Sequence, residues 1–283
     1  MRFLFIRHGE SVDNVAGVYA GSRDSPLTTH GVLQARRLAS HLAEGVNAES
    51  PPLAHVFSST LRRAVKTAQA ICDTHNEHRD GHRLSVVQVA DLQERHFGAR
   101  EGVSFRSGGA AAPAAPDVRA GHDGAETTAA MKRRADSFLD DYIVPLLSCD
   151  VDEHVSCAVV AHGIILAVLF RALVARMPHG TVGLPAEQER NGLVVGDGAP
   201  FVLPSWSNTG YLDFVVRSVV DAPAPSLGLT PSLPLLLSIR RVNCTDHLRG
   251  LRKTRGGIGS AAFDERQRTV DSFFTRPQPP PPP

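Results

Sequence analysis

The chain begins MRFLFIRHGES (residues 1–11), in which an apolar run at residues 2–6 passes directly into Arg7 and His8. A short run of aromatic and β-branched residues predicts a strand that is buried on both faces. Arg7 and His8 could simply cap that strand at the surface. The alternative is that the strand delivers them to a site, and in that case the rest of the chain must supply partners for them.

Similar apolar runs recur along the chain and alternate with patterns of helical period. Strands are expected at residues 2–6, 55–59, 84–89, 157–162, 211–216 and 233–239. Apolar stripes at helical spacing lie within residues 32–42, 61–71 and 131–146, and a further helix is expected to start at Gly163. This alternation predicts an α/β fold, a three-layer sandwich with a mostly parallel central sheet flanked by helices on both faces.

Three segments interrupt the alternation and set the expected domain organisation. Residues 1–248 are predicted to form one domain with insertions at about 103–125 and 178–205, the first of them rich in Gly, Ala and Pro. Residues 249–283 form a basic tail that ends in PQPPPPP. We expect this tail to be extended and at least partly disordered, because polyproline has no internal hydrogen bonds and this one has no evident partner.

The composition limits which binding partners and which cellular compartment are expected. The 283 residues carry a formal net charge of +1 at pH 7, which gives no net field for nucleic acid or an anionic membrane, so any anion must be held by a local cluster. We expect no export signal, because the apolar stretch before Arg7, residues 3–6, is too short for one. We expect no membrane span, because the longest apolar run, residues 163–170, stops at Arg171. The cysteines lack CxxC or metal-ligand spacing, which favours a reducing, cytoplasmic compartment. They are Cys72, Cys149, Cys157 and Cys244.

Charged and polar residues follow four of the predicted strands at the point where each ends. In an open α/β sheet, ligands bind at the carboxyl ends of the strands, so these side chains are expected to converge. They are Arg7, His8, Arg62, Arg63, Glu94 and His162.

Such a cluster suits covalent phosphoryl transfer. Fixed cations, here Arg7, Arg63 and a protonated His162, hold a phosphoryl group by charge-assisted hydrogen bonds, and the helix that starts at Gly163 would aim free N–H groups at the same place. A neutral imidazole can then attack phosphorus while a carboxylic acid protonates the departing alkoxide. The built-in cations make a metal or another cofactor unnecessary.

Four motifs in this region carry a resemblance to a known family. They are RHGES at 7–11, STLRRAVKTA at 59–68, LQERHFG at 92–98 and AHG at 161–163. In this order and at this spacing they resemble the signature set of the histidine phosphatase, or phosphoglycerate mutase-like, superfamily across roughly residues 1–245. RHG alone would be weak support, whereas the ordered set is strong.

The resemblance implies a role for each matched residue. His8 would be the phosphorylated nucleophile, and Glu94 the proton donor and later the base for water. Arg7, Arg63 and His162 would form the phosphate pocket, with His162 also taking part in catalysis. Taken alone, Glu94 could instead be a surface partner for a neighbouring arginine.

Further residues are assigned more loosely. Asn14 matches the family asparagine that reaches the phosphate, and of the two adjacent arginines Arg63, which precedes Ala64 as in the family pattern, fits better than Arg62. For the substrate we assign Ser22, Arg95 and Asn208. Ser22 lies in the loop at 21–31, Arg95 follows the proton donor, and Asn208 belongs to the SNTG turn at 207–210. With Arg100 and the loop at 107–124, Arg95 and the SNTG turn are expected to form an outer wall that meets a second phosphate.

Within the superfamily the sequence favours a phosphatase. The continuation Glu101-Gly102 after ERHFG resembles the phosphatase branch, and LQERHFGAREG, DGAET at 123–127, SNTG and VNCTDHLRGLRKT at 242–254 resemble TIGAR-type sugar bisphosphatases. The resemblance implies a metal-independent phosphatase acting on fructose-2,6-bisphosphate or a similar sugar or glycerate bisphosphate. The Gly/Ala/Pro segment at 107–124 departs from that pattern where such enzymes cover the substrate.

Two alternatives stay open. One is a phosphoglycerate mutase. The other is a non-catalytic member that keeps the phosphate pocket but docks partners through the tail at 249–283, which the complete set of motif residues argues against. The expected partner is a small phosphorylated metabolite, with no nucleic acid and no membrane, and no residue supports a protein partner for the proline-rich tail.

Overall fold

The computed structural model describes residues 1–44, 51–78, 83–105, 124–148, 155–177, 181–183, 203, 205–218, 235–254, 257–264 and 266. Three predictions therefore fall largely outside the described residues. They concern the Gly/Ala/Pro segment from residue 107, the second insertion at 178–205, and the polyproline end, and the same holds for Cys149.

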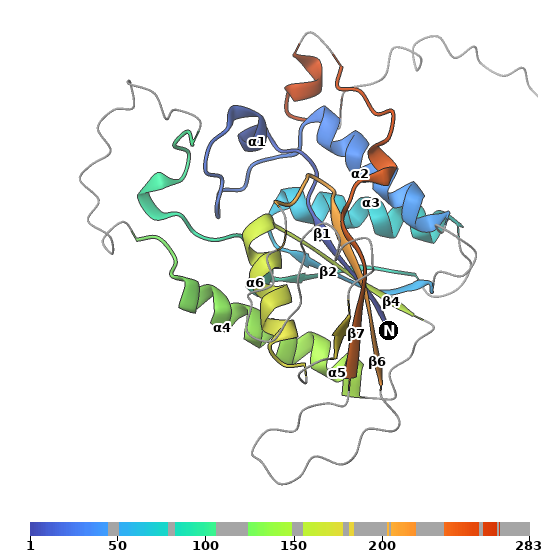
Figure 1. Ribbon diagram of the computed structural model, residues 1–283. Helices are drawn as coiled ribbons and strands as arrows, with labels where there is room; N and C mark the ends of the chain where they lie inside the picture. Colours follow the sequence, from blue (N-terminus) through green and yellow to red (C-terminus); the bar gives the residue numbers. More distant parts are fainter. Residues whose placement is uncertain are drawn as a thin grey trace, which may run out of the picture.

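A seven-stranded sheet forms the centre of the described structure, in the order β3-β2-β4-β1-β6-β7-β5 (Figure 1). The strands are β1 (Arg2–Arg7), β2 (Leu53–Ser59), β3 (Val86–Val89), β4 (Ser156–Ala161), β5 (Val182–Gly183), β6 (Tyr211–Ser218) and β7 (Leu235–Cys244). Strand β1, which the opening motif encodes, lies inside the sheet between β4 and β6.

The sheet is mixed. β1, β2, β3 and β4 run parallel to one another where they pair, whereas β6 is antiparallel to both β1 and β7. The alternation of strands and helices led us to expect a mostly parallel sheet. Apolar runs do not encode strand direction, so the antiparallel β6 was not anticipated. The parallel part carries the predicted motifs, and Arg7 at the end of β1 stands opposite Ala161 at the end of β4.

Helices lie on both sides of this sheet, with α2 and α3 on one side and α4 and α6 on the other (Figure 1). The α-helices are α1 (Val12–Ala16), α2 (Thr29–Ala43), α3 (Arg62–His78), α4 (Thr128–Phe138), α5 (Val144–Ser148) and α6 (Gly163–Val174). None of the helices that the structure describes is long and apolar enough to cross a membrane.

Alternate side chains of β1 enter two different cores. Phe3 and Phe5 pack with the residues of α4 and α6, and Phe5 lies edge-on to Phe170 with ring centroids 6.4 Å apart. Leu4 and Ile6 face the other way, into the core formed with α2 and α3. Because both faces of β1 are covered, its sequence is a continuous apolar run. The same burial holds β1 in place and so fixes the position of Arg7 and His8 at its end.

The predicted helix at 131–146 is divided. A π-helical turn at Leu139–Ile143 separates α4 from α5. Pro145, in the first turn of α5, has no N–H to donate to the carbonyl of Asp141, and its ring would clash with that carbonyl in a regular helix. The wider turn just before Pro145 accommodates it.

The beginning of the predicted tail lies on the domain. Lys253 Nζ pairs with Glu10 Oε1 at 2.8 Å, and the N–H of Phe263 donates to the carbonyl of Leu27 at 3.0 Å. An isolated bridge joins Ala262 to Thr28, the residue that caps α2. The described part of residues 249–264 therefore packs beside the loop that follows the first motif.

Candidate active site

A cavity of about 590 Å³ opens where the predicted strand ends meet. Six of the residues singled out in the sequence line it together, although they come from four separate segments of the chain. These residues are Arg7, His8, Asn14, Arg63, Glu94 and His162. Arg7 and His8 therefore lie together with the other charged and polar residues that a binding site at this strand end would need.

His8 is held as a neutral imidazole with one defined tautomer. Its side chain is buried, and Nδ1 lies 2.7 Å from the carbonyl oxygen of Gly9. A carbonyl accepts only, so we assign the proton to Nδ1, which leaves the lone pair of Nε2 free. Burial, aided by the charges of Arg63 and Arg7, lowers the pKa of His8 well below its ordinary value. The ring is therefore in the state that a nucleophile needs.

Glycine is required after His8 by a close backbone approach. A Cβ on Gly9 would lie 2.5 Å from the carbonyl oxygen of Gly31, near the start of α2. The N–H of Gly9 also donates to Thr67 Oγ1 at 3.1 Å, which ties the loop to α3. The close packing of Gly9 against Gly31 and its hydrogen bond to Thr67 hold the Gly9 carbonyl, which orients the His8 ring.

Two arginines bring positive charge to the cavity. Arg63 is almost fully buried and donates to the carbonyls of Gly21 at 2.7 Å and Arg23 at 2.6 Å. Burial lowers the pKa of Arg63 to about 10, a value at which it still carries its charge at neutral pH. Arg7 donates through Nη1 to the carbonyl of Trp206, and its buried Nε has no partner among the described residues. A buried, unpaired cationic donor is suited to an anionic ligand.

His162 differs from the expectation of a protonated side chain. Its Nδ1 accepts a hydrogen bond from Arg63 Nε at 3.2 Å, so that nitrogen carries no proton, and Nε2 lies 2.9 Å from Ser59 Oγ. Burial, followed by the charge of Arg63, lowers the pKa of His162 well below its ordinary value. His162 is therefore neutral in this state, with the Nε2–H as its donor. The site's fixed positive charge comes from Arg7 and Arg63.

Glu94 occupies the beginning of α6. Its Oε2 accepts from the N–H of Ile164 at 3.1 Å, and its Oε1 accepts from the N–H of Ile165 at 3.2 Å and of Arg95 at 2.9 Å. We expected the first N–H groups of this helix to be free for a phosphate, and this is wrong for Ile164 and Ile165. A helix begins with unpaired N–H groups, and here the side-chain oxygens of Glu94, which follows another strand, accept from two of them.

A local capping motif places Asn14. Ser11 and Asn14 form a capping box around α1, in which Asn14 Oδ1 accepts from the N–H of Ser11 at 3.1 Å. The same oxygen accepts from Asn208 Nδ2 at 3.0 Å. With Oδ1 fixed in this way, the amide nitrogen of Asn14 is the group that it can offer to a ligand in the cavity.

The three residues that we assigned to the substrate do not line this cavity. Ser22 donates through both its N–H and its hydroxyl to Glu101. Arg95 donates to the carbonyl of Glu126 at 3.0 Å. Asn208 lies behind the first motif and donates to the carbonyl of His8 at 3.2 Å. Each side chain thus has a protein partner, and their role in substrate binding stays a prediction.

Comparison with known proteins agrees with the motif set. Residues 3–189 match the family model described as "Histidine phosphatase superfamily (branch 1)". The chain belongs to the histidine phosphatase superfamily. Its family and its relatives named as phosphatases identify it as a phosphoric monoester hydrolase.

Among its relatives, a Schizosaccharomyces pombe protein named as a probable phosphatase is 29% identical over 96% of this chain and 79% of its own length. An Arabidopsis thaliana metal-independent phosphoserine phosphatase is 36% identical, but over 40% of this chain and 42% of its own. A 2,3-bisphosphoglycerate-dependent phosphoglycerate mutase of Lactobacillus johnsonii is 37% identical over 36% of this chain and 42% of its own length.

Solved structures share the fold at low sequence identity. A mycobacterial glucosyl-3-phosphoglycerate phosphatase covers 86% of this chain and 98% of its own, with a TM-score of 0.57 and 20% identity. The match to the α-ribazole phosphatase of Shigella flexneri covers 87% of this chain and 97% of that protein, with a TM-score of 0.52 and 21% identity. At these identities the likeness concerns the fold of the histidine phosphatases and leaves the substrate open.

The outer part of this histidine phosphatase's cavity was not anticipated from the sequence. Its wall includes the aromatic side chains of Tyr19, Phe97, Phe105 and Trp206. Tyr19 lies between the two phenylalanines, with ring centroids 4.8 Å from Phe97 and 5.5 Å from Phe105. These residues belong to irregular segments that lack helical or strand period, so the pattern of the sequence did not indicate them.

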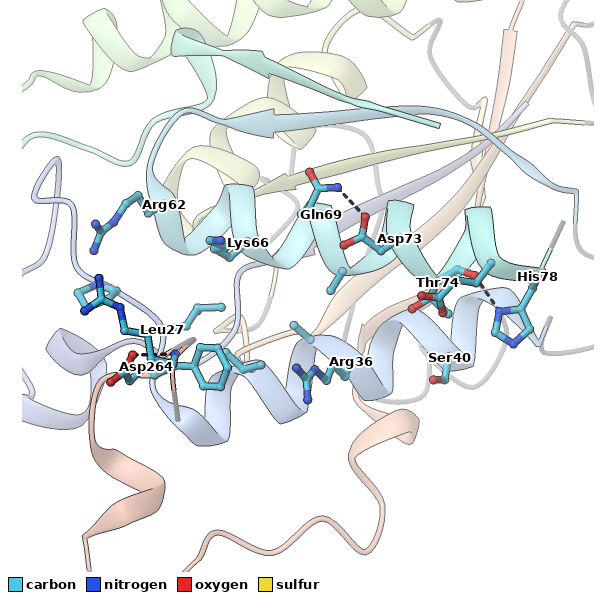
Figure 2. A pocket seen from close by; sticks show the side chains of 17 residues that line it. Leu27, Arg36, Ser40, Arg62, Lys66, Gln69, Asp73, Thr74, His78 and Asp264 are labelled. Carbon is cyan, nitrogen blue, oxygen red and sulfur yellow. Dashed lines mark hydrogen bonds between the residues drawn. The ribbon is translucent and has the colours of Figure 1, made fainter. Parts of the chain in front are cut away.

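A second cavity, of about 950 Å³, lies between α2 and α3 and is lined in part by the segment near residue 264 (Figure 2). Arg62 lines this cavity, and its Nε lies 3.3 Å from Asp24. The adjacent Arg63 is buried beside His162 in the first cavity. The structure therefore separates the two arginines of the STLRRA motif, and the phosphate-binding role of Arg63 stays a prediction.

Proposed function

We propose that this chain is a metal-independent phosphatase that hydrolyses phosphate monoesters of small metabolites through a phosphohistidine on His8. The observation that carries the proposal is the hydrogen bond from His8 Nδ1 to the Gly9 carbonyl, which leaves Nε2 unprotonated in a cavity that also contains Arg7 and Arg63. A neutral nucleophile beside two fixed cations suits attack on a phosphate dianion.

The reaction would proceed in two displacements. First, His8 Nε2 forms a bond to phosphorus as the bond to the ester oxygen breaks, and the proton of a protonated Glu94 passes to the departing alkoxide. Then Glu94, now a carboxylate, removes a proton from water, whose oxygen attacks phosphorus as the P–N bond breaks. Inorganic phosphate leaves, and His8 and Glu94 return to their starting states. Arg7 and Arg63 neutralise the phosphoryl oxygens throughout.

For the substrate, the sequence resemblance favours a sugar or glycerate bisphosphate, and fructose-2,6-bisphosphate is the first candidate that it suggests. A phosphoglycerate mutase is the alternative, since it uses the same first displacement but returns the phosphoryl group to a sugar acid rather than to water. A non-catalytic member that only binds phosphorylated partners is the other alternative.

The setting of the reaction is also a proposal. We propose a reducing, cytoplasmic compartment and a small phosphorylated metabolite as the partner, with no nucleic acid and no membrane. Cys72, Cys157 and Cys244 are free thiols in the described structure. Burial raises the pKa of the Cys72 thiol to about 11 and raises that of Cys157 further, which keeps both thiols protonated and favours a structural role over a redox role.

The central test compares His8→Ala with a control at an exposed histidine, His78→Ala. After brief exposure to a 32P-labelled ester, the unmodified protein and His78→Ala should carry acid-labile, base-stable label, whereas His8→Ala should carry none. We expect His8→Ala to lose turnover of 4-nitrophenyl phosphate by a factor of about 10³ or more. Near-normal turnover in His8→Ala would refute the mechanism.

Independence from metal has its own test. Among the described residues no cluster of three or more His, Cys, Asp or Glu side chains could hold a metal ion, and metal independence stays a prediction until it is measured. Turnover should be unchanged in excess chelator and inhibited by vanadate. Transfer of phosphate from 2,3-bisphosphoglycerate to a phosphoglycerate, at a rate above release to water, would favour the mutase instead.

A further inference from the structure

The cavity is much larger than a phosphoryl group, and its two ends differ in chemistry. The inner end contains the charged and hydrogen-bonding residues described above. The apolar lining includes the rings of Tyr19, Phe97 and Phe105, which lie next to one another, and the side chains of Ile164 and Trp206. Phe105 is 53% exposed, which is unusual for a side chain of its size. Exposed apolar groups that gather in a cavity commonly mark a ligand surface.

Backbone hydrogen bonds hold this wall in place. The N–H of Tyr19 donates to the carbonyl of Val103 at 3.0 Å, and the N–H of Gly102 donates to the carbonyl of Tyr19 at 2.8 Å. The N–H of Phe105 donates to the carbonyl of Gly17 at 2.9 Å. Tyr19 and Phe105 are therefore fixed relative to each other before any ligand binds. Such preorganisation lowers the entropic cost of binding.

Positive charge is concentrated at the inner end. Among the described residues that line the cavity, the arginines are Arg7 and Arg63, and they line it together with His8. Arg95, which we expected to meet a second phosphate, instead donates to the Glu126 carbonyl and lies with its guanidinium carbon 5.8 Å from the centre of the Phe97 ring. Arg95 thus supports the aromatic wall from outside the cavity.

We propose that Tyr19, Phe97 and Phe105 form a subsite for the leaving group, and that the preferred substrates are phosphate monoesters of apolar alcohols, above all those with a planar ring. This inference rests on the proposed phosphatase function and replaces the bisphosphate substrate that the sequence resemblance suggested. The phosphoryl group binds between Arg7 and Arg63, and the ring of the alcohol packs against the aromatic wall, where offset or edge-on stacking adds to the burial of apolar surface.

The kinetic test uses two alkyl esters whose alcohols are similar in acidity but differ in apolar surface. We expect kcat/KM for 2-phenylethyl phosphate to exceed that for ethyl phosphate at least tenfold, mainly through a lower KM. In Phe105→Ser this ratio should fall at least threefold. Ile258→Ser is the matched control, because Ile258 is 56% exposed and does not line the cavity, and it should keep the ratio of the unmodified protein.

A binding test does not depend on turnover. The chain contains one tryptophan, Trp206, which lines the cavity, so its fluorescence should change when a ligand binds there. We expect 2-phenylethylphosphonate, which cannot be hydrolysed, to bind at least tenfold more tightly than ethylphosphonate, a difference of about 1.4 kcal/mol. Phe105→Ser should reduce that difference, and Ile258→Ser should not.

The outcomes separate this inference from the proposed function. Turnover of both alkyl esters with equal kcat/KM, or equal binding of the two phosphonates, would overturn the aromatic subsite and leave the phosphatase mechanism intact. A kcat/KM for fructose-2,6-bisphosphate tenfold above that for 2-phenylethyl phosphate would also overturn it. Absence of turnover for every ester would refute the proposed function, whereas the phosphonate comparison would still decide the subsite.

Discussion

Arg63 and His162 lie in direct contact in the cavity, with the guanidinium Nε donating to imidazole Nδ1 at 3.2 Å. This contact fixes the tautomer of His162, since Nδ1 must then be an acceptor and Nε2 must carry the hydrogen. Nε2 in turn lies 2.9 Å from Ser59 Oγ. A phosphoryl group beside these residues meets a charged donor in Arg63, whereas the single N–H of His162 is donated to Ser59 Oγ.

Replacing Arg63 by lysine should therefore be costly although the charge is kept. A lysine cannot reproduce the three directed contacts to His162, Gly21 and Arg23, so buried acceptors would lose their partners. We expect kcat/KM for a phosphate ester to fall about 100-fold in Arg63→Lys. The matched control is Arg62→Lys, whose exposed pair with Asp24 contributes little, and it should stay within about twofold. Equal losses in the two variants would contradict the assignment.

Glu94→Gln tests the acid role. The first displacement determines kcat/KM, so this parameter isolates protonation of the leaving group from the later activation of water. For an alkyl phosphate we expect kcat/KM to fall about 100-fold or more, and for 4-nitrophenyl phosphate, whose leaving group is stable without a proton, about tenfold or less. The amide would also lose one hydrogen bond from α6, so the melting temperature should be measured alongside. Equal losses on both esters would remove Glu94 from this role.

The sequence predicted that these charged residues would lie together, and they line one cavity, for physical reasons. β1 is buried on both faces, so its apolar run is continuous and its end is evident. The choice of Arg63 over Arg62 also agrees with helical period, because Arg63, Thr67 and Ile71 lie on the buried side of α3. Residues that must be both buried and charged stand out against an apolar stripe, and the parallel strands bring them to one edge.

Other features depend on contacts that no period encodes. Tyr19 and Phe105 meet through backbone hydrogen bonds between two irregular segments, which leaves no pattern in either segment. The neutral state of His162 follows from its burial and its contact with Arg63, and the loss of free N–H groups at α6 follows from where the Glu94 side chain lies. Each is a pairwise, long-range relationship, whereas the sequence pattern reports burial along one element at a time.

Mutation of Asn208 can show whether this residue positions Asn14 or contacts the substrate, as we first assigned. Its Nδ2 donates to the carbonyl of His8 at 3.2 Å and to Asn14 Oδ1 at 3.0 Å. If Asn208 acts by orienting Asn14, the losses in kcat/KM from Asn208→Ala and Asn14→Ala should not add, and a double-mutant cycle should give a coupling of at least about 0.5 kcal/mol. Additive losses would instead support an independent contact with the substrate.

Stability should depend on pH through a buried histidine behind the site. His247 Nε2 lies 2.9 Å from Thr209 Oγ1, and the N–H of Thr209 donates to the carbonyls of Arg7 at 3.0 Å and His8 at 3.2 Å. Burial, followed by the charge of His41 and opposed by Asp246, lowers the pKa of His247 to about 4. Its Nδ1 is buried without a partner among the described residues, so a second proton there would be unfavourable.

The direction of the effect follows from which state binds more protons. An unfolded chain has a histidine pKa of about 6.5, so between about pH 6.5 and pH 4 the unfolded state binds more protons at His247 and the free energy of unfolding falls as the pH falls. His247→Gln keeps an N–H that can reach Thr209 but cannot titrate. We expect the loss of unfolding free energy between pH 7 and pH 5, measured by urea denaturation, to be smaller in His247→Gln by about 1–2 kcal/mol. His8 and His162, whose pKa values are also lowered, contribute with the same sign in both proteins and cancel in the comparison. An identical pH dependence in the two proteins would show that His247 titrates alike in the folded and unfolded chain.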